Sequence, residues 1–164
     1  MGLDMYLYLR KHESVGSWEE GFNQKKKDFY PTELKEFAKE RASRDFLSKS
    51  TTYYIGYWRK ANAIHNWFVE NCGNGMDECQ TIYVSLEDAE ELLDICKQVL
   101  DNPEKAPELL PTQEGFFFGS TDYDDYYFDD LKYTIELLTK VINFIRQHKD
   151  ELNPTWDITY EASW

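Results

Sequence analysis

The chain has 164 residues, of which 31 are Asp or Glu and 18 are Lys or Arg, so its formal net charge is −13. This length predicts one domain over residues 1–164, able to bury a core without a disulfide or a metal. The negative charge excludes non-specific binding to nucleic acid, whose phosphates it would repel, and no apolar run is long enough to predict a membrane span.

The cysteines and the N-terminus bear on the compartment. The chain has three cysteines, Cys72, Cys79 and Cys96. Their odd number predicts free thiols, and the spacing of the first two does not match a structural zinc site. The start "MGLDMYLYLRK" lacks the basic segment and cleavage site of a signal peptide. These features predict a cytoplasmic protein without a bound metal.

The first third of the chain combines strand and helix patterns. Residues 3–10 place Leu or Met at every second position, which predicts a half-buried strand. Residues 11–30 lack periodicity and predict a loop. Pro31 and Thr32 are typical of a helix start. "STTYYIGYW" at 50–58, rich in β-branched and aromatic residues, predicts a second strand.

The middle of the chain predicts two helices. The stretch from about 58 to 71 predicts a helix that ends at "NCGNG", where two glycines lie close together. "TIYV" at 81–84 predicts a short strand. Ser85 and Asp88 then have the spacing of a capping box, and the apolar residues that follow predict an amphipathic helix.

The last third predicts the central helix of the fold. "GFFFGS" at 115–120 predicts a short strand or turn, and Ser120 or Thr121 is expected to cap a long helix with two adjacent apolar stripes. Pro154 ends that helix, and "WDITYEASW" predicts a final strand. The order of elements predicts an α+β fold, with a small, mostly antiparallel sheet packed by about four helices.

The stretch "GYWRKANAIHNWF" at 56–68 is unusually rich in polar and aromatic residues. Helical spacing would divide it into a core face, a solvent face and a boundary stripe that is half buried. The boundary stripe consists of Trp58, Asn62, His65 and Val69.

Two interpretations of this helix stay open. In the first, Arg59 and Lys60 lie in its first turn, where free backbone N–H groups favour an anion. Asn62 and His65 would then add hydrogen bonds, and Trp58 a stacking surface. In the second, the helix edge merely docks on the sheet, and a backbone carbonyl satisfies His65.

Residues 106–131 contain seven acids and no Lys, Arg or His. The acids within "STDYDDYYFDD" either complement the dipole of the long helix or form a surface that imitates nucleic acid. Their spacing does not match a calcium loop. Tyr123 and Tyr126 are three apart, so we expect them to share a face and to wall a pocket. No nucleotide-binding or hydrolase motif is present, so we predict no catalytic residue and no cofactor.

Several segments together resemble a family of small, uncharacterised proteins of bacteriophages and prophages. They are "MGLDMYLY", "GYWRKANAIHNWFVEN", "YVSLEDAEELLDICKQVL" and "LLPTQEGFFFGSTDYDDYYFDDL", and they span nearly the whole chain. The resemblance implies a viral accessory protein in the bacterial cytoplasm that binds and blocks or sequesters a host molecule. It assigns no catalytic residue.

Three hypotheses follow for function. The first is a protein that binds a small anionic or nucleotide-like host ligand. The second is an acidic inhibitor that binds a host protein through residues 122–130. The third is an enzyme that acts on a phosphorylated substrate through His65 and a nearby carboxylate.

Overall fold

The computed structural model describes residues 2–29 and 46–164. Their four-stranded sheet has the order β2-β1-β4-β3, and every neighbouring pair is antiparallel. The strands are β1 (Asp4–Gly16), β2 (Phe46–Arg59), β3 (Ile82–Val84) and β4 (Thr155–Ser163). The helices are α1 (Phe22–Phe29), α2 (Asn62–Asn71), α3 (Leu86–Asp101), α4 (Ala106–Leu109) and α5 (Asp125–His148), with a 3-10 turn at Pro103–Lys105. This architecture confirms the predicted α+β fold class.

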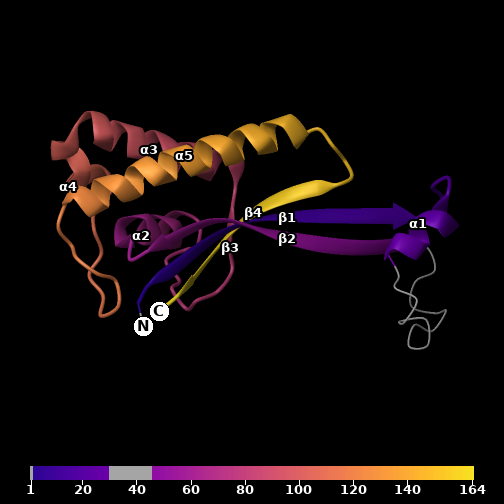
Figure 1. Cartoon of the computed structure of the whole chain (residues 1–164), viewed down its shortest axis with the longest axis horizontal. Coiled ribbons are helices and arrows are strands. Elements are labelled where there is room, and N and C mark those ends of the chain that lie inside the picture. Colours follow the sequence, from indigo (N-terminus) through magenta and orange to yellow (C-terminus); the bar gives the residue numbers. More distant parts are fainter. Residues whose placement is uncertain (1, 30–45) are drawn as a thin grey trace.

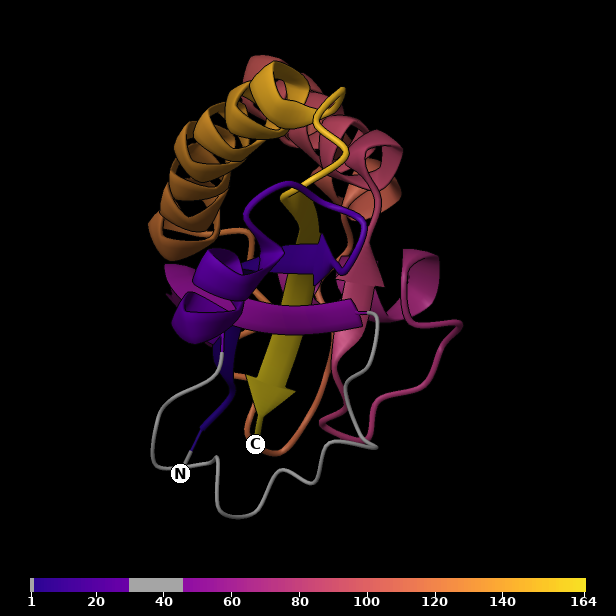
Figure 2. The same cartoon turned by 90° about the vertical axis from the view of Figure 1, so that its right-hand side faces the viewer.

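The helices α3 and α5 pack against each other along one side of the sheet (Figures 1 and 2). The β1–β2 hairpin continues away from these helices, and α1 lies at its far end (Figure 1). β4 accompanies β1 only as far as His12, so the last residues of β1 pair with β2 alone. No helix in the described ranges has the length and apolar character needed to cross a membrane.

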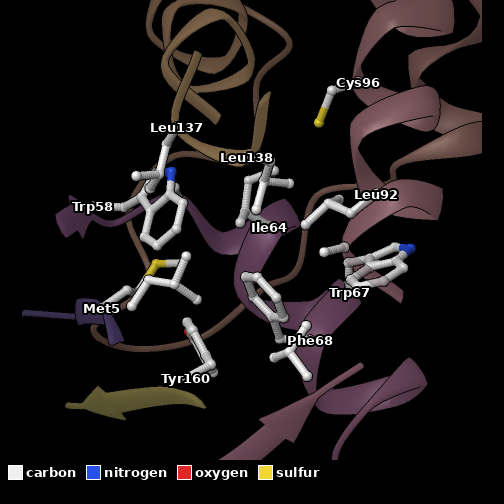
Figure 3. Close-up of a cluster of buried hydrophobic side chains, with 14 of the residues drawn as sticks. Met5, Trp58, Ile64, Trp67, Phe68, Leu92, Cys96, Leu137, Leu138 and Tyr160 are labelled. Atoms are coloured by element: carbon white, nitrogen blue, oxygen red, sulfur yellow. The ribbon is translucent and has the colours of Figure 1, made fainter. Parts of the chain in front are cut away.

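The core lies between the sheet and the pair α3–α5, and α2 is inserted into it. Figure 3 shows Ile64 and Phe68 of α2 between helix residues such as Leu138 and the strand residues Met5 and Tyr160. The Phe68 and Tyr160 rings stack with their centroids 4.3 Å apart. Burying side chains of this size stabilises the fold by about 1.5 to 3 kcal/mol each. α2 is therefore part of the core as well as a candidate for binding.

Side chains of β1 alternate between the core and a tyrosine-rich outer face. Met5, Leu7 and Leu9 are buried, whereas Tyr6 and Tyr8 are only partly buried. The ring of Tyr6 lies 6.0 Å from that of Tyr54 and 5.5 Å from that of Tyr57, which are both on β2. Cross-strand packing therefore accounts for several tyrosines of the chain.

Two predicted boundaries are wrong, and a third lies outside the described residues. The expected loop 11–30 contains the rest of β1 and all of α1. Its strand residues show no hydrophobic alternation because most of them lie in the protruding hairpin, where neither face packs on the core. The long helix α5 is capped by Asp124, whose Oδ1 accepts a hydrogen bond from the Tyr127 N–H at 3.1 Å, and not by Ser120 or Thr121. The helix start expected at 31–32 lies outside the described residues.

Candidate functional site

The start of α2 differs from the prediction that a helix begins at residue 58. Trp58 and Arg59 still pair with the start of β1 as strand residues, and the helix begins only at Asn62. Lys60 connects the two elements with φ of 61°, a left-handed conformation that is unusual for a residue other than glycine. The strand continues because Trp58 points into the core and Arg59 toward solvent, which is the alternation of a strand.

The predicted half-buried stripe is also wrong. Trp58, Asn62, His65 and Val69 are each at most 5% exposed. They are buried because α2 is covered by more than the sheet: α3, α5 and the loop after α4 also pack around it. Buried polar atoms need partners, and each polar member of this stripe has them.

Trp58 serves as a core residue. Its indole Nε1–H donates a hydrogen bond to Thr134 Oγ1 of α5 at 2.9 Å. Its ring meets those of Phe68 and Tyr133 edge-on, at centroid distances of 6.2 and 5.7 Å. No open ring surface is left for stacking on a ligand.

His65 is held by two side chains and not by a backbone carbonyl. Its Nε2 lies 3.1 Å from Asp77 Oδ2, and its Nδ1 lies 2.7 Å from the Tyr160 hydroxyl. A carboxylate only accepts hydrogen bonds, so Nε2–H donates to Asp77 and Nδ1 accepts from the Tyr160 O–H. Burial raises the pKa of Tyr160 well above its usual value, which keeps that hydroxyl protonated. With 1% of its surface exposed, His65 has no access to a substrate.

Asn62 joins α2 to the loop that follows α4. Its Nδ2 donates to the carbonyls of Phe118 and Ser120 at 3.0 and 2.7 Å. Its Oδ1 accepts from the backbone N–H of Gln113 at 2.9 Å. These three bonds use most of the amide's capacity, so Asn62 positions the loop and has little left for a ligand.

A cavity of about 310 Å³, here named the α2–α5 cavity, lies between the start of α2 and the start of α5. It is lined by Arg59, Lys60, Ala61, Asn62, Ala63, Ile64, Thr112, Gly119, Ser120, Asp122, Asp124, Tyr126, Tyr127, Asp130 and Leu131. Four of the seven predicted site residues line it, namely Arg59, Lys60, Asn62 and Tyr126. Trp58, His65 and Tyr123 do not.

One end of the cavity is basic. Arg59 is 62% exposed, and its Nε lies only loosely, at 4.0 Å, from Asp4 Oδ1. The Lys60 ammonium forms no ion pair with any residue that the structure describes. The backbone N–H groups of Ala63 and Ile64 likewise make no hydrogen bond within the described ranges. Two cationic side chains and two free N–H donors therefore line the same end, a combination that suits an anion.

The other end is acidic. Asp124 is occupied with capping α5, whereas the carboxylates of Asp122 and Asp130 accept no hydrogen bond from the described residues. Burial, followed by the charges of Asp129 and Asp124, raises the pKa of Asp130 from 3.8 to about 6. Across residues 2–29 and 46–164, no three His, Cys, Asp or Glu side chains form a group that could hold a metal ion.

Tyr123 and Tyr126 do not share a face as predicted, because α5 starts at Asp125 and Tyr123 precedes it. The Tyr123 ring packs edge-on against Tyr127 at 5.0 Å, and its hydroxyl accepts from the Thr112 N–H at 3.3 Å. Tyr126 is 81% exposed and lines the cavity.

Sequence reasoning did not single out Asp130, although a signal for it exists. Asp130 lies four residues after Tyr126, so the two share a face of α5. The same spacing relates Tyr127 to Leu131, whose side chains are buried. The expected helix contained both residues as well, so the spacing was available from the sequence, whereas the burial of Asp130 and its place in the cavity were not.

A scan against protein-family models and searches of curated proteins and solved structures gave no match to this chain, and the resemblance to phage and prophage proteins therefore stays a prediction.

Proposed function

We propose that the protein binds a small anionic, nucleotide-like ligand in the α2–α5 cavity. The observation that carries this proposal is the basic end of the cavity. Arg59, Lys60 and the free N–H groups of Ala63 and Ile64 line it together, and Lys60 has no competing ion pair among the described residues. A phosphate or carboxylate would receive charge-assisted hydrogen bonds there.

The rest of the cavity suits the remainder of such a ligand. Its volume of about 310 Å³ lies at the lower end of the range for small-molecule sites. Ile64 and Leu131 contribute buried apolar surface, and Tyr126 offers an exposed ring on which a planar group can stack.

Strain at Lys60 gives independent support. A left-handed conformation costs a residue with a side chain about 1 kcal/mol or more, and such outliers gather at functional sites. Glycine would adopt φ of 61° without this cost. A lysine at this position lowers the stability of the fold, and it places an ammonium group at the cavity.

The two alternative functions have less support. An acidic inhibitor would bind through the carboxylates around residues 122–130. Two of these are engaged, since Asp124 caps α5 and Asp129 pairs with Lys132 at 2.7 Å. The carboxylates of Asp122 and Asp130 are free, but both residues line the cavity. An enzyme using His65 would need that ring to reach a substrate, and it is buried against Asp77 and Tyr160. Binding of an anionic ligand would use Lys60 and the N–H groups of Ala63 and Ile64, which have no partner among the described residues.

Under this proposal the protein acts in the cytoplasm of a bacterial host, where it sequesters a host metabolite or signalling molecule. The three cysteines, Cys72, Cys79 and Cys96, are all free thiols, as suits a reducing compartment. Burial raises the pKa of Cys72 and of Cys96 to about 12, so these two thiols are unreactive.

A calorimetric and thermal-shift titration with nucleoside monophosphates tests the proposal. At least one should raise the melting temperature, and Arg59→Ala should weaken its binding about tenfold, as expected for a lost charge-assisted contact. Lys140→Ala is the matched control, because that side chain is on α5, pairs with Glu136 and does not line the cavity. Failure of every nucleotide to bind, or equal binding by Arg59→Ala and the control, would refute the proposal.

A further inference from the structure

The α2–α5 cavity is divided by charge, and this division restricts its ligand beyond the presence of an anionic group. Arg59 and Lys60 line it from the side of α2, whereas Asp122 and Asp130 line it from the side of α5 and contribute two carboxylates that accept no hydrogen bond from the described residues. A ligand that is anionic throughout would be repelled by the acidic part. The ligand should therefore carry hydrogen-bond donors at the end opposite its phosphate.

Asp130 is the acid best placed to recognise such donors. It is partly buried on α5, one helical turn after Tyr126, so a ring stacked on Tyr126 would lie beside its carboxylate. The two charged residues that affect it most are Asp129 on α5 and Asp124, the N-cap of α5, and both are acids. An ionised carboxylate in such surroundings destabilises the folded chain unless a ligand supplies donors, and this is the pattern of a binding group.

We propose that Asp130 is a specificity-determining residue that accepts two parallel hydrogen bonds from adjacent N–H groups of the ligand, so that the cavity prefers guanine among the nucleotide bases. This inference rests on the proposed function. A carboxylate has two oxygens and no donor, and it pairs best with two donors side by side. Guanine presents its ring N–H beside its exocyclic amino group. Adenine and cytosine each place a ring acceptor beside a single amino group, which an ionised Asp130 would repel.

Hypoxanthine gives the sharpest comparison, because it equals guanine without the exocyclic amino group. The phosphate, the ribose and the stacking surface are the same in GMP and IMP. Any difference in their affinities therefore measures the second hydrogen bond to the carboxylate and the correct alignment of the first.

The experiment is a calorimetric titration of the full chain with GMP, IMP and AMP at pH 8. We expect GMP to bind about tenfold or more tightly than IMP or AMP, the discrimination typical of a good bidentate pair. Asp130→Asn should bring the three affinities within about threefold of one another, because its amide offers one acceptor and one donor and therefore weakens GMP while it relieves the repulsion of AMP. Arg59→Ala should weaken all three to a similar extent.

The control is Asp129→Asn, which removes a neighbouring charge from an exposed side chain that does not line the cavity and should keep the preference for GMP. Circular dichroism establishes that each variant is folded, and Asp130→Ser provides a second test if Asp130→Asn is not. Equal binding of GMP, IMP and AMP to the unaltered chain, or an unchanged preference in Asp130→Asn, would overturn the role of Asp130 while the proposed function stands. Failure of all three to bind would instead overturn the proposed function.

Discussion

Replacing Asp130 with asparagine tests whether this carboxylate is held at a cost in stability. The pKa of Asp130 rises from 3.8 to about 6 on folding because burial and the charges of Asp129 and Asp124 oppose ionisation. Arg59 and Lys60 line the same cavity but are not among the groups that set this shift. Between about pH 4 and pH 6 the folded chain therefore binds a proton that the unfolded chain has lost. The contribution of Asp130 to stability falls as the pH rises through this window, and it stays low above it.

The size of the effect follows from the pKa values. A change from 3.8 to about 6 corresponds to about 3 kcal/mol at about 1.4 kcal/mol per pH unit. Asp130 is only partly buried, so solvent screening reduces the expected effect to about 1 to 2 kcal/mol. In a chain of this length, that difference should raise the melting temperature of Asp130→Asn above that of the unaltered chain by about 3 to 6 °C.

Urea or thermal unfolding of both chains at pH 4, 5, 6 and 8 measures this effect. At pH 4 the free energy of unfolding of Asp130→Asn should nearly equal that of the unaltered chain. The variant should become the more stable of the two as the pH rises to 6, and the difference should persist at pH 8. Asp94→Asn, an exposed position on α3, should show no such gain. A loss of stability in Asp130→Asn at pH 8, or an equal gain at pH 4 and pH 8, would contradict the reasoning.

Other substitutions test the surroundings of the cavity, each by urea unfolding. Asn62→Ala removes three hydrogen bonds and leaves buried backbone groups unpaired, so we expect a loss of about 3 kcal/mol, whereas the half-exposed control Asn66→Ala should change stability by less than about 0.5 kcal/mol. Lys60→Gly should gain up to about 1 kcal/mol by relieving the left-handed conformation, and a loss would show that no strain is stored there. Gly56→Ala should lose about 1 to 3 kcal/mol, because a Cβ at this position would lie 2.3 Å from Leu137 Cδ2, and unchanged stability would mean that Leu137 can move aside.

Local patterns predicted the elements whose structure is decided locally. The capping box before α3 is present as expected, with the Ser85 Oγ accepting from the Asp88 N–H at 3.0 Å and the Asp88 carboxylate accepting from the Ser85 N–H at 3.0 Å. The alternation in residues 3–10 predicted the packed part of β1. The protruding end of β1 escaped prediction because pairing with β2 holds it and because residues 11–14 are only partly buried on either face, so they show no apolar alternation.

The binding site was harder to predict because its boundaries depend on non-local pairing. Trp58 and Arg59 have residue types that a helix also tolerates, and only hydrogen bonding to β1 identifies them as strand residues. That pairing leaves Lys60 to turn the chain, and so brings both cationic side chains to the edge of the cavity. The acidic end was visible in composition, but Asp130 becomes prominent only through its partial burial and its place in the cavity, which depend on tertiary packing.

The crowded stretch at 56–68 shows why a high density of polar residues is not in itself the mark of a ligand site. Each of its buried polar side chains is bonded to a segment far away in the chain: Trp58 to α5, Asn62 to the loop before α5, and His65 to β4 and to Asp77. The Trp58 bond holds α5 against β2, and the Asn62 bonds hold the loop against α2, so both help to shape the α2–α5 cavity. The groups left free are the charged ones at its rim. Substitutions at the buried positions should therefore change stability and binding together, whereas substitutions of Arg59 should change binding alone.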